Sequence, residues 1–225
     1  MLRATFEREL QDLKDRTLAL GVEVENNIVE VIRVLGERDG KAAKRLIAGD
    51  LEINRKRIAI MNDGLVLIAT QQPMAGDMRL IASVTEIAGE LERINDYVKG
   101  IARISLMIGT DPIPGALDGL PLMAEKTRLM LEQALSAAID ADVELAREIP
   151  KLDDEIDFLF NDTYRQLVEL VTDDPSLIER ANHLEWVAHN IERAADRVTN
   201  ICEWIVYMVT GEYIEMDSEL EAPPS

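Results

Sequence analysis

The chain has 225 residues, of which 47% are hydrophobic and only 4% aromatic, a composition that excludes intrinsic disorder and favours a helical core of Leu, Ile, Val, Met and Ala. Its formal net charge of −19 repels phosphate backbones and anionic lipid surfaces, which argues against direct nucleic-acid binding. The single cysteine, Cys202, cannot form an internal disulfide, no signal-peptide leader opens the chain, and no apolar run approaches the ~20 residues of a membrane span. We therefore expect a cytoplasmic protein.

Apolar residues spaced three and four apart predict three long helices in the first half of the chain. Gly36 and the Asp39-Gly40 pair end the first of them, Pro73 forbids continuation of the second, and Gly109 ends the third. The expected helices span about residues 6–35, 41–71 and 75–108.

The same plan repeats after the Pro/Gly segment Asp111-Pro-Ile-Pro-Gly115. Pro121 suits a first helical position, and Asp142 and Asp174 are expected to cap the following helices. Pro150 should kink the fifth helix just before Asp153. The expected helices span about residues 121–139, 142–171 and 175–210. The prediction is an all-α protein of two tandem-duplicated antiparallel three-helix bundles, six long helices in all, with the bundles at 1–110 and 111–215 and a frayed acidic tail at 216–225.

A repeated Glu-Arg-x-x-Asp motif supports the duplication. Glu92 and Asp96 in the third helix return 100 positions later as Glu192 and Asp196 in the sixth. Residues four apart lie on the same face of a helix, so each copy holds two carboxylates within reach of each other. Like charges at this spacing repel unless a cation lies between them, and the motif therefore predicts a metal ion.

A second pair of side chains with oxygen ligands accompanies each motif. Asp50 and Asn54 in the second helix return as Asp153 and Asp157 in the fifth, 103 positions later. If the helices are neighbours, the pairs converge on one ion or a small cluster. Oxygen ligands favour Mg²⁺, Ca²⁺, Mn²⁺ or Fe, and a nearby histidine keeps Zn and other transition metals open.

A helical projection adds further candidates. It places Glu192 and Asp196 on a polar stripe opposite the apolar face, so the motif is expected to face outward. The first half is expected to bind metal more loosely, because Lys99 and Arg103 share its stripe and Asn54 replaces an Asp. Possible additional ligands on the stripe in the sixth helix are Glu185, His189 and Glu203.

The charged stripe and Cys202 also have interpretations that involve no function. A charged stripe is most often a solvated helix face, and the chain would then be a helical scaffold without metal. Cys202 is expected to be an unreactive core residue. The chain has no glycine-rich phosphate loop and no nucleophile elbow, so a hydrolytic enzyme has little support.

Longer segments resemble a known family. Gln72-Pro-Met-Ala-Gly-Asp-Met-Arg79 and Glu90-Leu-Glu-Arg-Ile-Asn-Asp96 are similar to the P-x-A-x-D-L-R and L-E-R-I-G-D signatures of the PhoU family of bacterial phosphate-signalling regulators. Asp153-Asp-Glu-Ile-Asp157 and Ile191-Glu-Arg-Ala-Ala-Asp196 resemble the matching segments of the second half. The likeness spans about residues 5 to 212, although Asn95 and Ala195 stand where the family often has Gly.

The resemblance implies two three-helix bundles with multinuclear metal clusters on their surface. Carried over to this chain, the ligands would be Asp50, Glu92, Asp96, Asp153, Asp157, Glu192 and Asp196. It also implies a negative regulator of phosphate uptake that couples the phosphate ABC transporter to a sensor histidine kinase. Such a protein would be a homodimer at the inner face of the membrane, held there by its protein partners. The alternative is a phosphohydrolase with a multimetal carboxylate site.

Overall fold

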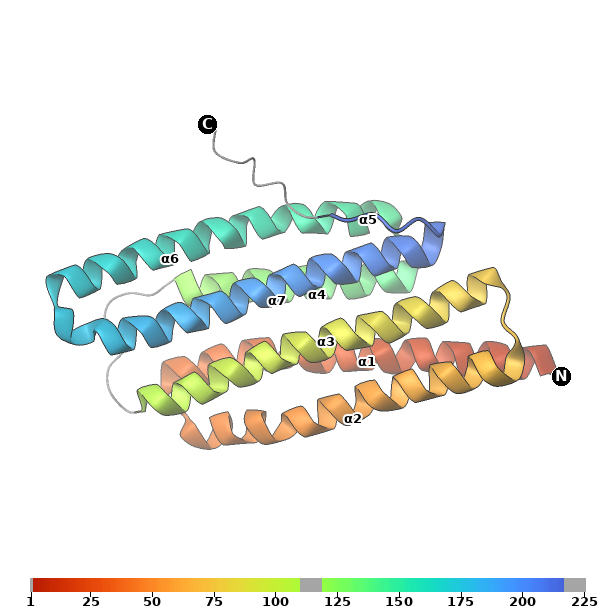
Figure 1. The fold of residues 1–225 in the computed structure, drawn as a ribbon, viewed down its shortest axis with the longest axis horizontal. Coiled ribbons are helices and arrows are strands. Elements are labelled where there is room, and N and C mark those ends of the chain that lie inside the picture. Colours follow the sequence, from red (N-terminus) through yellow and green to blue (C-terminus); the bar gives the residue numbers. More distant parts are fainter. Residues whose placement is uncertain (1, 110–118, 217–225) are drawn as a thin grey trace.

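A computed structural model of the chain describes residues 2–109 and 119–216. They form long antiparallel helices in two layers, the first half of the chain in one layer and the second half in the other (Figure 1). The first half contains α1 (Leu2–Glu37), α2 (Gly40–Gln71) and α3 (Ala75–Ile108). The second contains α4 (Gly119–Asp140), α5 (Val143–Glu148), a 3-10 turn (Ile149–Leu152), α6 (Asp153–Asp173), a second 3-10 turn (Pro175–Leu177) and α7 (Ile178–Thr210).

The fold predicted from the sequence is confirmed. The described residues contain no strand, and α5, its 3-10 turn and α6 together fill the place of one long helix, so each half has three helical rods. The predicted linker at 111–115 and most of the predicted tail lie outside the described residues. Met216, the first residue of that predicted tail, packs against the core.

The fifth predicted helix is wrong as a continuous α-helix. Pro150 has no N–H to donate and its ring crowds the preceding turn, so a regular helix cannot pass through it. The chain winds instead into the 3-10 turn Ile149–Leu152, and α6 starts afresh at Asp153. The break places three acidic residues, beginning with Asp153, in the first turn of α6, where the positive end of the helix dipole favours carboxylates.

Aspartate side chains cap the first turns of two helices, Asp142 as the sequence predicts and Asp39 in addition. The Asp39 carboxylate accepts hydrogen bonds from the backbone N–H groups of Lys41 and Ala42 at the start of α2. The Asp142 carboxylate accepts from the N–H of Leu145 at the start of α5. Each satisfies donors that the first helical turn leaves free.

The last helices of the two halves, α3 and α7, form the most extensive helix pair in the molecule. Their apolar faces belong to one continuous core that runs through both halves. Gly100 of α3 lies close to Asn190 of α7, and a Cβ there would come within 3.4 Å of the Asn190 amide. At the far end, α7 stops at Gly211, whose φ of 82° suits glycine, with the Arg79 guanidinium packed against it.

Two further expectations concern Cys202 and the membrane. Cys202 is fully buried, and burial raises the pKa of its thiol well above its usual value. It is therefore an unreactive core residue, as predicted. No helix in the described ranges 2–109 and 119–216 is long and apolar enough to cross a bilayer.

A close approach of α1 and α4 gives a test of this packing. A Cβ added to Gly21 would lie 2.4 Å from Cδ2 of Leu135, which is buried and has little room to move. We expect Gly21→Leu to lower the free energy of unfolding by about 1–3 kcal/mol through overpacking. Urea denaturation followed by circular dichroism measures the change. Gly36→Leu, in the same helix with open space around its Cβ, is the control and should be neutral or slightly stabilising; equal effects of the two changes would contradict the packing.

Candidate metal-binding sites

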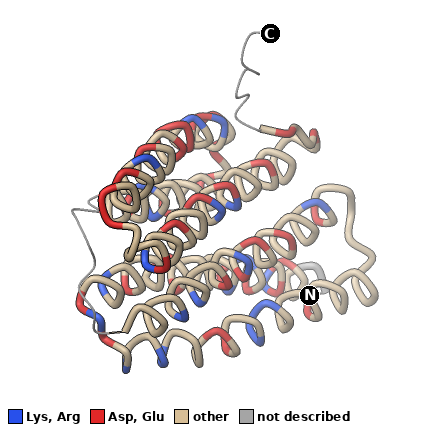
Figure 2. Tube along the Cα trace, turned by 60° about the vertical axis from the view of Figure 1, so that its left-hand side comes forward, with Lys and Arg blue, Asp and Glu red and all other residues tan. Residues whose placement is uncertain are grey.

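In the second half, α6 and α7 bring four predicted ligands together. Asp153 and Asp157 lie one turn apart on α6, and Glu192 and Asp196 lie one turn apart on α7. The four are close enough to shift one another's titration, since Asp157, Glu192 and Asp196 all raise the pKa of Asp153. The helix that supplies the first pair is strongly acidic, with seven Asp or Glu residues and one Arg (Figure 2).

Burial is the main influence on these carboxyl groups. Asp153 is only 5% exposed, and burial, reinforced by the charges of Asp196 and Asp157, raises its pKa to about 7. Burial followed by the Asp196 charge raises the pKa of Glu192 to about 7, and burial also raises the pKa of Asp157. Without a cation, the cluster therefore resists full ionisation.

Two oxygens of the cluster are buried with no hydrogen-bond partner among the described residues, Oδ1 of Asp153 and Oε2 of Glu192. The nearest basic nitrogen to the latter, Nδ1 of His189, is 3.6 Å away. Arg193 donates a hydrogen bond to Asp196, at 2.7 Å. Buried polar atoms are normally satisfied, and carboxylate oxygens suit hard cations. The donor set therefore fits a metal ion.

The four carboxylates are nevertheless not arranged as a finished coordination sphere. No group of three His, Cys, Asp or Glu side chains in the described part of the chain has the geometry of a preformed metal site. Binding at this cluster therefore requires side-chain rotation to bring the oxygens onto one ion.

Of the possible additional ligands, the structure places one beside the cluster and two elsewhere. His189 lies beside the cluster, with its ring packed edge-on against Trp186. Glu185 lines a separate, mainly apolar groove between α6 and α7. Glu203 is buried and accepts hydrogen bonds from the Tyr213 hydroxyl at 2.8 Å and the Met216 N–H at 2.7 Å, so it holds the segment after α7.

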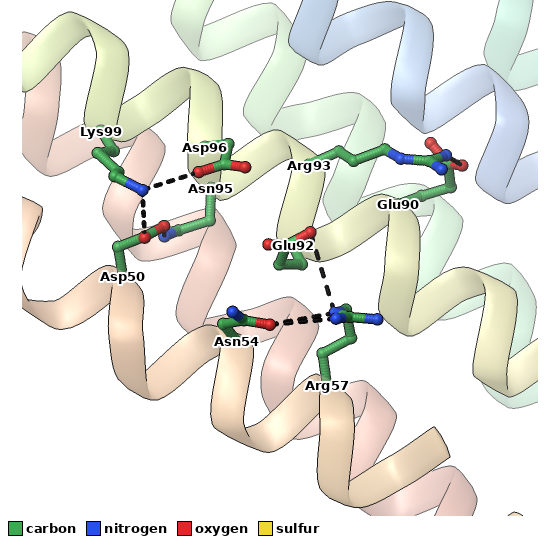
Figure 3. Close-up of polar contacts among 9 residues, drawn as sticks. All are labelled: Asp50, Asn54, Arg57, Glu90, Glu92, Arg93, Asn95, Asp96 and Lys99. Atoms are coloured by element: carbon green, nitrogen blue, oxygen red, sulfur yellow. Dashed lines mark hydrogen bonds and ion pairs between the residues drawn. The ribbon is translucent and has the colours of Figure 1, made fainter. Parts of the chain in front are cut away.

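The first-half cluster lies between α2 and α3 and is already paired (Figure 3). Lys99 Nζ lies 2.5 Å from Oδ2 of Asp50 and 3.1 Å from Oδ1 of Asp96. The hydrogen bond to Asp50, followed by that to Asp96, raises the pKa of Lys99, which is therefore charged at neutral pH. Arg103, which shares the predicted stripe, is exposed.

The remaining two members of the first-half cluster contact Arg57. Its Nη2 donates to Oδ1 of Asn54 at 3.2 Å, and its Nε lies 4.0 Å from Oε2 of Glu92 (Figure 3). Burial is the main cause that raises the pKa of Glu92, and the Asp96 charge adds to it. The first half therefore brings together the residues that correspond to the second-half cluster, but here they contact basic side chains.

The predicted outward orientation of the motifs is wrong in one respect. The side chain of Glu92 is 21% exposed and that of Glu192 is 20% exposed, because α2 and α6 cover the polar faces of α3 and α7. The projection of a single helix shows which face is polar and cannot show which neighbour covers it.

Sequence reasoning missed two residues of the first-half motif region, Arg57 and Glu90. Glu90 is 4% exposed and forms an ion pair with Arg93 on its own helix. From α7, Arg197 lies 3.7 Å from its Oε2 and Asn200 donates to the same oxygen at 3.4 Å. Glu90 is two positions before Glu92 and so on the opposite face of α3, a signal that places it at the α3–α7 seam.

A family model described as the PhoU domain matches residues 17–105 and again residues 120–205. The chain belongs to the PhoU family. Each PhoU match contains one copy of the paired acidic motif, which accords with the internal duplication.

Similar proteins of the PhoU family cover nearly the whole chain. The phosphate-specific transport system accessory protein PhoU homolog of Rhizobium meliloti is 33% identical over 93% of this chain and 89% of its own length. The phosphate-specific transport system accessory protein PhoU of Escherichia coli is 31% identical over 92% of this chain and 86% of its own. The crystal structure of the phosphate transport system regulatory protein PhoU from Streptococcus pneumoniae superposes with a TM-score of 0.87 at 28% identity, over 93% of this chain and 99% of that one.

Proposed function

We propose that this protein is a metal-binding accessory regulator of phosphate-specific transport. Membership of the PhoU family supports the regulatory role, because its relatives are named as accessory or regulatory proteins of the phosphate transport system. They are not named as enzymes, so the phosphohydrolase alternative is set aside. The observation that carries the metal proposal is the second-half cluster, with two buried carboxylate oxygens that lack hydrogen-bond partners.

In this proposal the ligands in the second half are Asp153, Asp157, Glu192 and Asp196, and His189 stands at the edge of the site. A bound di- or trivalent cation would supply the positive charge that the four carboxylates lack, and Fe, Mn, Mg, Zn and Ca all accept oxygen ligands. The protein itself holds two pairs of carboxylates on adjacent helices and excludes water from Asp153. Metal binding would therefore fasten α6 to α7.

The regulatory part of the proposal is that the protein is a negative regulator of phosphate uptake. The protein would act in the cytoplasm as a homodimer, contact the phosphate ABC transporter and a phosphate-sensing histidine kinase, and damp the response when phosphate is plentiful. These expectations rest on the family resemblance.

Affinity capture of the tagged protein from cells grown with and without phosphate tests this role. We expect transporter and kinase subunits to be recovered from phosphate-replete cells, and recovery to fall for Glu192→Ala/Asp196→Ala. Asp162→Ala, which removes a carboxylate of α6 outside the cluster, is the control. If neither transporter nor kinase subunits are enriched over an untagged control under either condition, the proposed role is wrong.

A further inference from the structure

The first-half cluster contains two side-chain cations that have no counterpart in the second half. The Lys99 ammonium lies between a carboxylate of α2 and a carboxylate of α3, 2.5 Å from Asp50 and 3.1 Å from Asp96. Its side chain is only 23% exposed, so it is held within the helix interface. An ammonium in this position links the same two helices that a bridging metal ion would link.

Arg57 provides the second cation. It donates to Oδ1 of Asn54 and lies 4.0 Å from Glu92 (Figure 3). The other oxygen of Asp50 accepts a hydrogen bond from Nδ2 of Asn95 at 3.0 Å. In the first half, both oxygens of Asp50 and one oxygen of Asp96 therefore accept hydrogen bonds from side-chain donors, and Glu92 lies beside a guanidinium. In the second half, by contrast, Oδ1 of Asp153 and Oε2 of Glu192 are buried without a hydrogen-bond partner in the described structure.

The internal duplication provides a direct comparison. At the offset of 100 that relates the two motifs, Lys99 corresponds to Thr199, and at the offset of 103 that relates α2 to α6, Arg57 corresponds to Phe160. Both counterparts are uncharged. The Thr199 hydroxyl is buried without a hydrogen-bond partner in the described structure, so it does not replace the ammonium.

The helices that face the two motifs have opposite charge. The helix that faces the first motif, α2, carries six Lys or Arg and three Asp or Glu residues. The helix that faces the second, α6, carries seven Asp or Glu residues and one Arg. The charge of α6 therefore attracts cations to the second cluster, and the charge of α2 repels them from the first.

We propose that Lys99 and Arg57 take the place of a metal ion in the first half, so that the protein binds its metal in the second half only. To bind in the first half, a metal ion would have to displace Lys99 from two carboxylates, and it would meet three carboxylates opposed by two cations. In the second half it meets four carboxylates and one flanking cation, Arg193. This inference rests on the metal-binding function proposed above and assigns it to one of the two clusters.

The test is the amount of Mn²⁺ per chain, measured by elemental analysis after loading and dialysis, with isothermal titration calorimetry for affinity. Glu92→Gln/Asp96→Asn should bind as much Mn²⁺ as the wild type. The matched pair Glu192→Gln/Asp196→Asn should lose its Mn²⁺ to the background level. Circular dichroism verifies that each variant is folded.

A variant that gains Mn²⁺ tests whether Lys99 and Arg57 prevent metal binding in the first half. Replacing the two cations and the amide by the residues of the second half, as Lys99→Thr/Arg57→Phe/Asn54→Asp, should add Mn²⁺ to the wild-type amount. The added Mn²⁺ should disappear again when Glu92→Gln is introduced into the same variant. A folded triple variant that binds no additional Mn²⁺ would contradict the assignment to Lys99 and Arg57.

The failures of the two proposals are distinguishable. A decrease in Mn²⁺ per chain in Glu92→Gln/Asp96→Asn would overturn the one-site inference and leave the metal-binding function standing. A wild-type protein that retains no Mn²⁺ would overturn the metal-binding function and, with it, this inference.

Discussion

Asp153→Asn is expected to raise the thermal unfolding midpoint of the metal-free protein at pH 8 and to abolish the stabilisation that Mn²⁺ provides. Asp153 is 5% exposed and lies near four other carboxylates that raise its pKa, so its charge opposes folding when no cation is present. Asparagine has nearly the same shape without the charge. We expect the midpoint of the metal-free variant to rise by on the order of 5 °C, since about 1 kcal/mol corresponds to roughly 2–4 °C in a protein of this size.

The sign of the pH dependence follows from the raised pKa. Asp153 has a pKa of about 7 when folded and 3.8 as its ordinary value, so the folded state binds more protons between these limits. The contribution of Asp153 to the free energy of unfolding of the metal-free protein therefore falls as the pH rises from about 4 to about 7, and is lowest above that range. Glu192, with a pKa of about 7, contributes in the same direction. Asp153→Asn should flatten this dependence.

Differential scanning calorimetry at pH 5.5 and pH 8, with and without Mn²⁺, measures both effects. Ligand binding stabilises the folded state by mass action, by about 2.7 kcal/mol when the free metal is 100 times its dissociation constant. The exposed neighbour Asp154 gives the control Asp154→Asn, which should keep the Mn²⁺ response. An Mn²⁺ response of wild-type size in Asp153→Asn would show that Asp153 is not a ligand.

Ending the chain after Gly211 is expected to destabilise the whole protein. The segment that follows α7 provides both hydrogen bonds to the buried Glu203 carboxylate, from the Tyr213 hydroxyl and the Met216 N–H. The rings of Trp204 and Tyr213 also contact each other in a tilted arrangement, with their centroids 5.1 Å apart. Removal would leave a charged group buried without these donors, at a cost of about 3 kcal/mol or more.

Urea denaturation of two shortened chains measures this effect. A chain that ends after Met216 retains both bonds and is the control, whereas a chain that ends after Gly211 loses them. In the shorter chain, Glu203→Met removes the unpaired charge and should restore much of the lost stability. If the two shortened chains unfold at the same urea concentration, the segment does not stabilise α7.

The helices could be predicted closely from the sequence because each has a local cause. The period of the apolar residues fixes the buried face, Asp39 and Asp142 cap helices through their own side chains, and Pro73 and Pro150 restrict the backbone wherever they occur. The form of the break at Pro150 was not predictable in the same way. A kinked α-helix and a 3-10 turn satisfy the same local restriction, and the turn observed here contacts α4 and α7, which lie elsewhere in the sequence.

The residues of the candidate sites could be predicted from the sequence, but their ion pairing and burial could not. The two offsets in the sequence identify which carboxylates belong together, and the structure brings each set to one helix pair. Whether a carboxylate is free or paired depends on residues from another helix, such as Arg57 beside Glu92, and the spacing of a motif carries no information about them. Burial of Asp153 depends likewise on the packing of α6 against α7, and its raised pKa follows from that packing.

The seam between α3 and α7 is expected to couple the folding of the two duplicated halves, because both contribute to one core. A single half would expose the apolar face of its last helix to water and would part Glu90 from Arg197 and Asn200. We therefore expect that neither repeat folds alone, although each has a complete set of helices. The protein is expected to unfold in one cooperative transition, in which loss of structure in either repeat removes the support of the other.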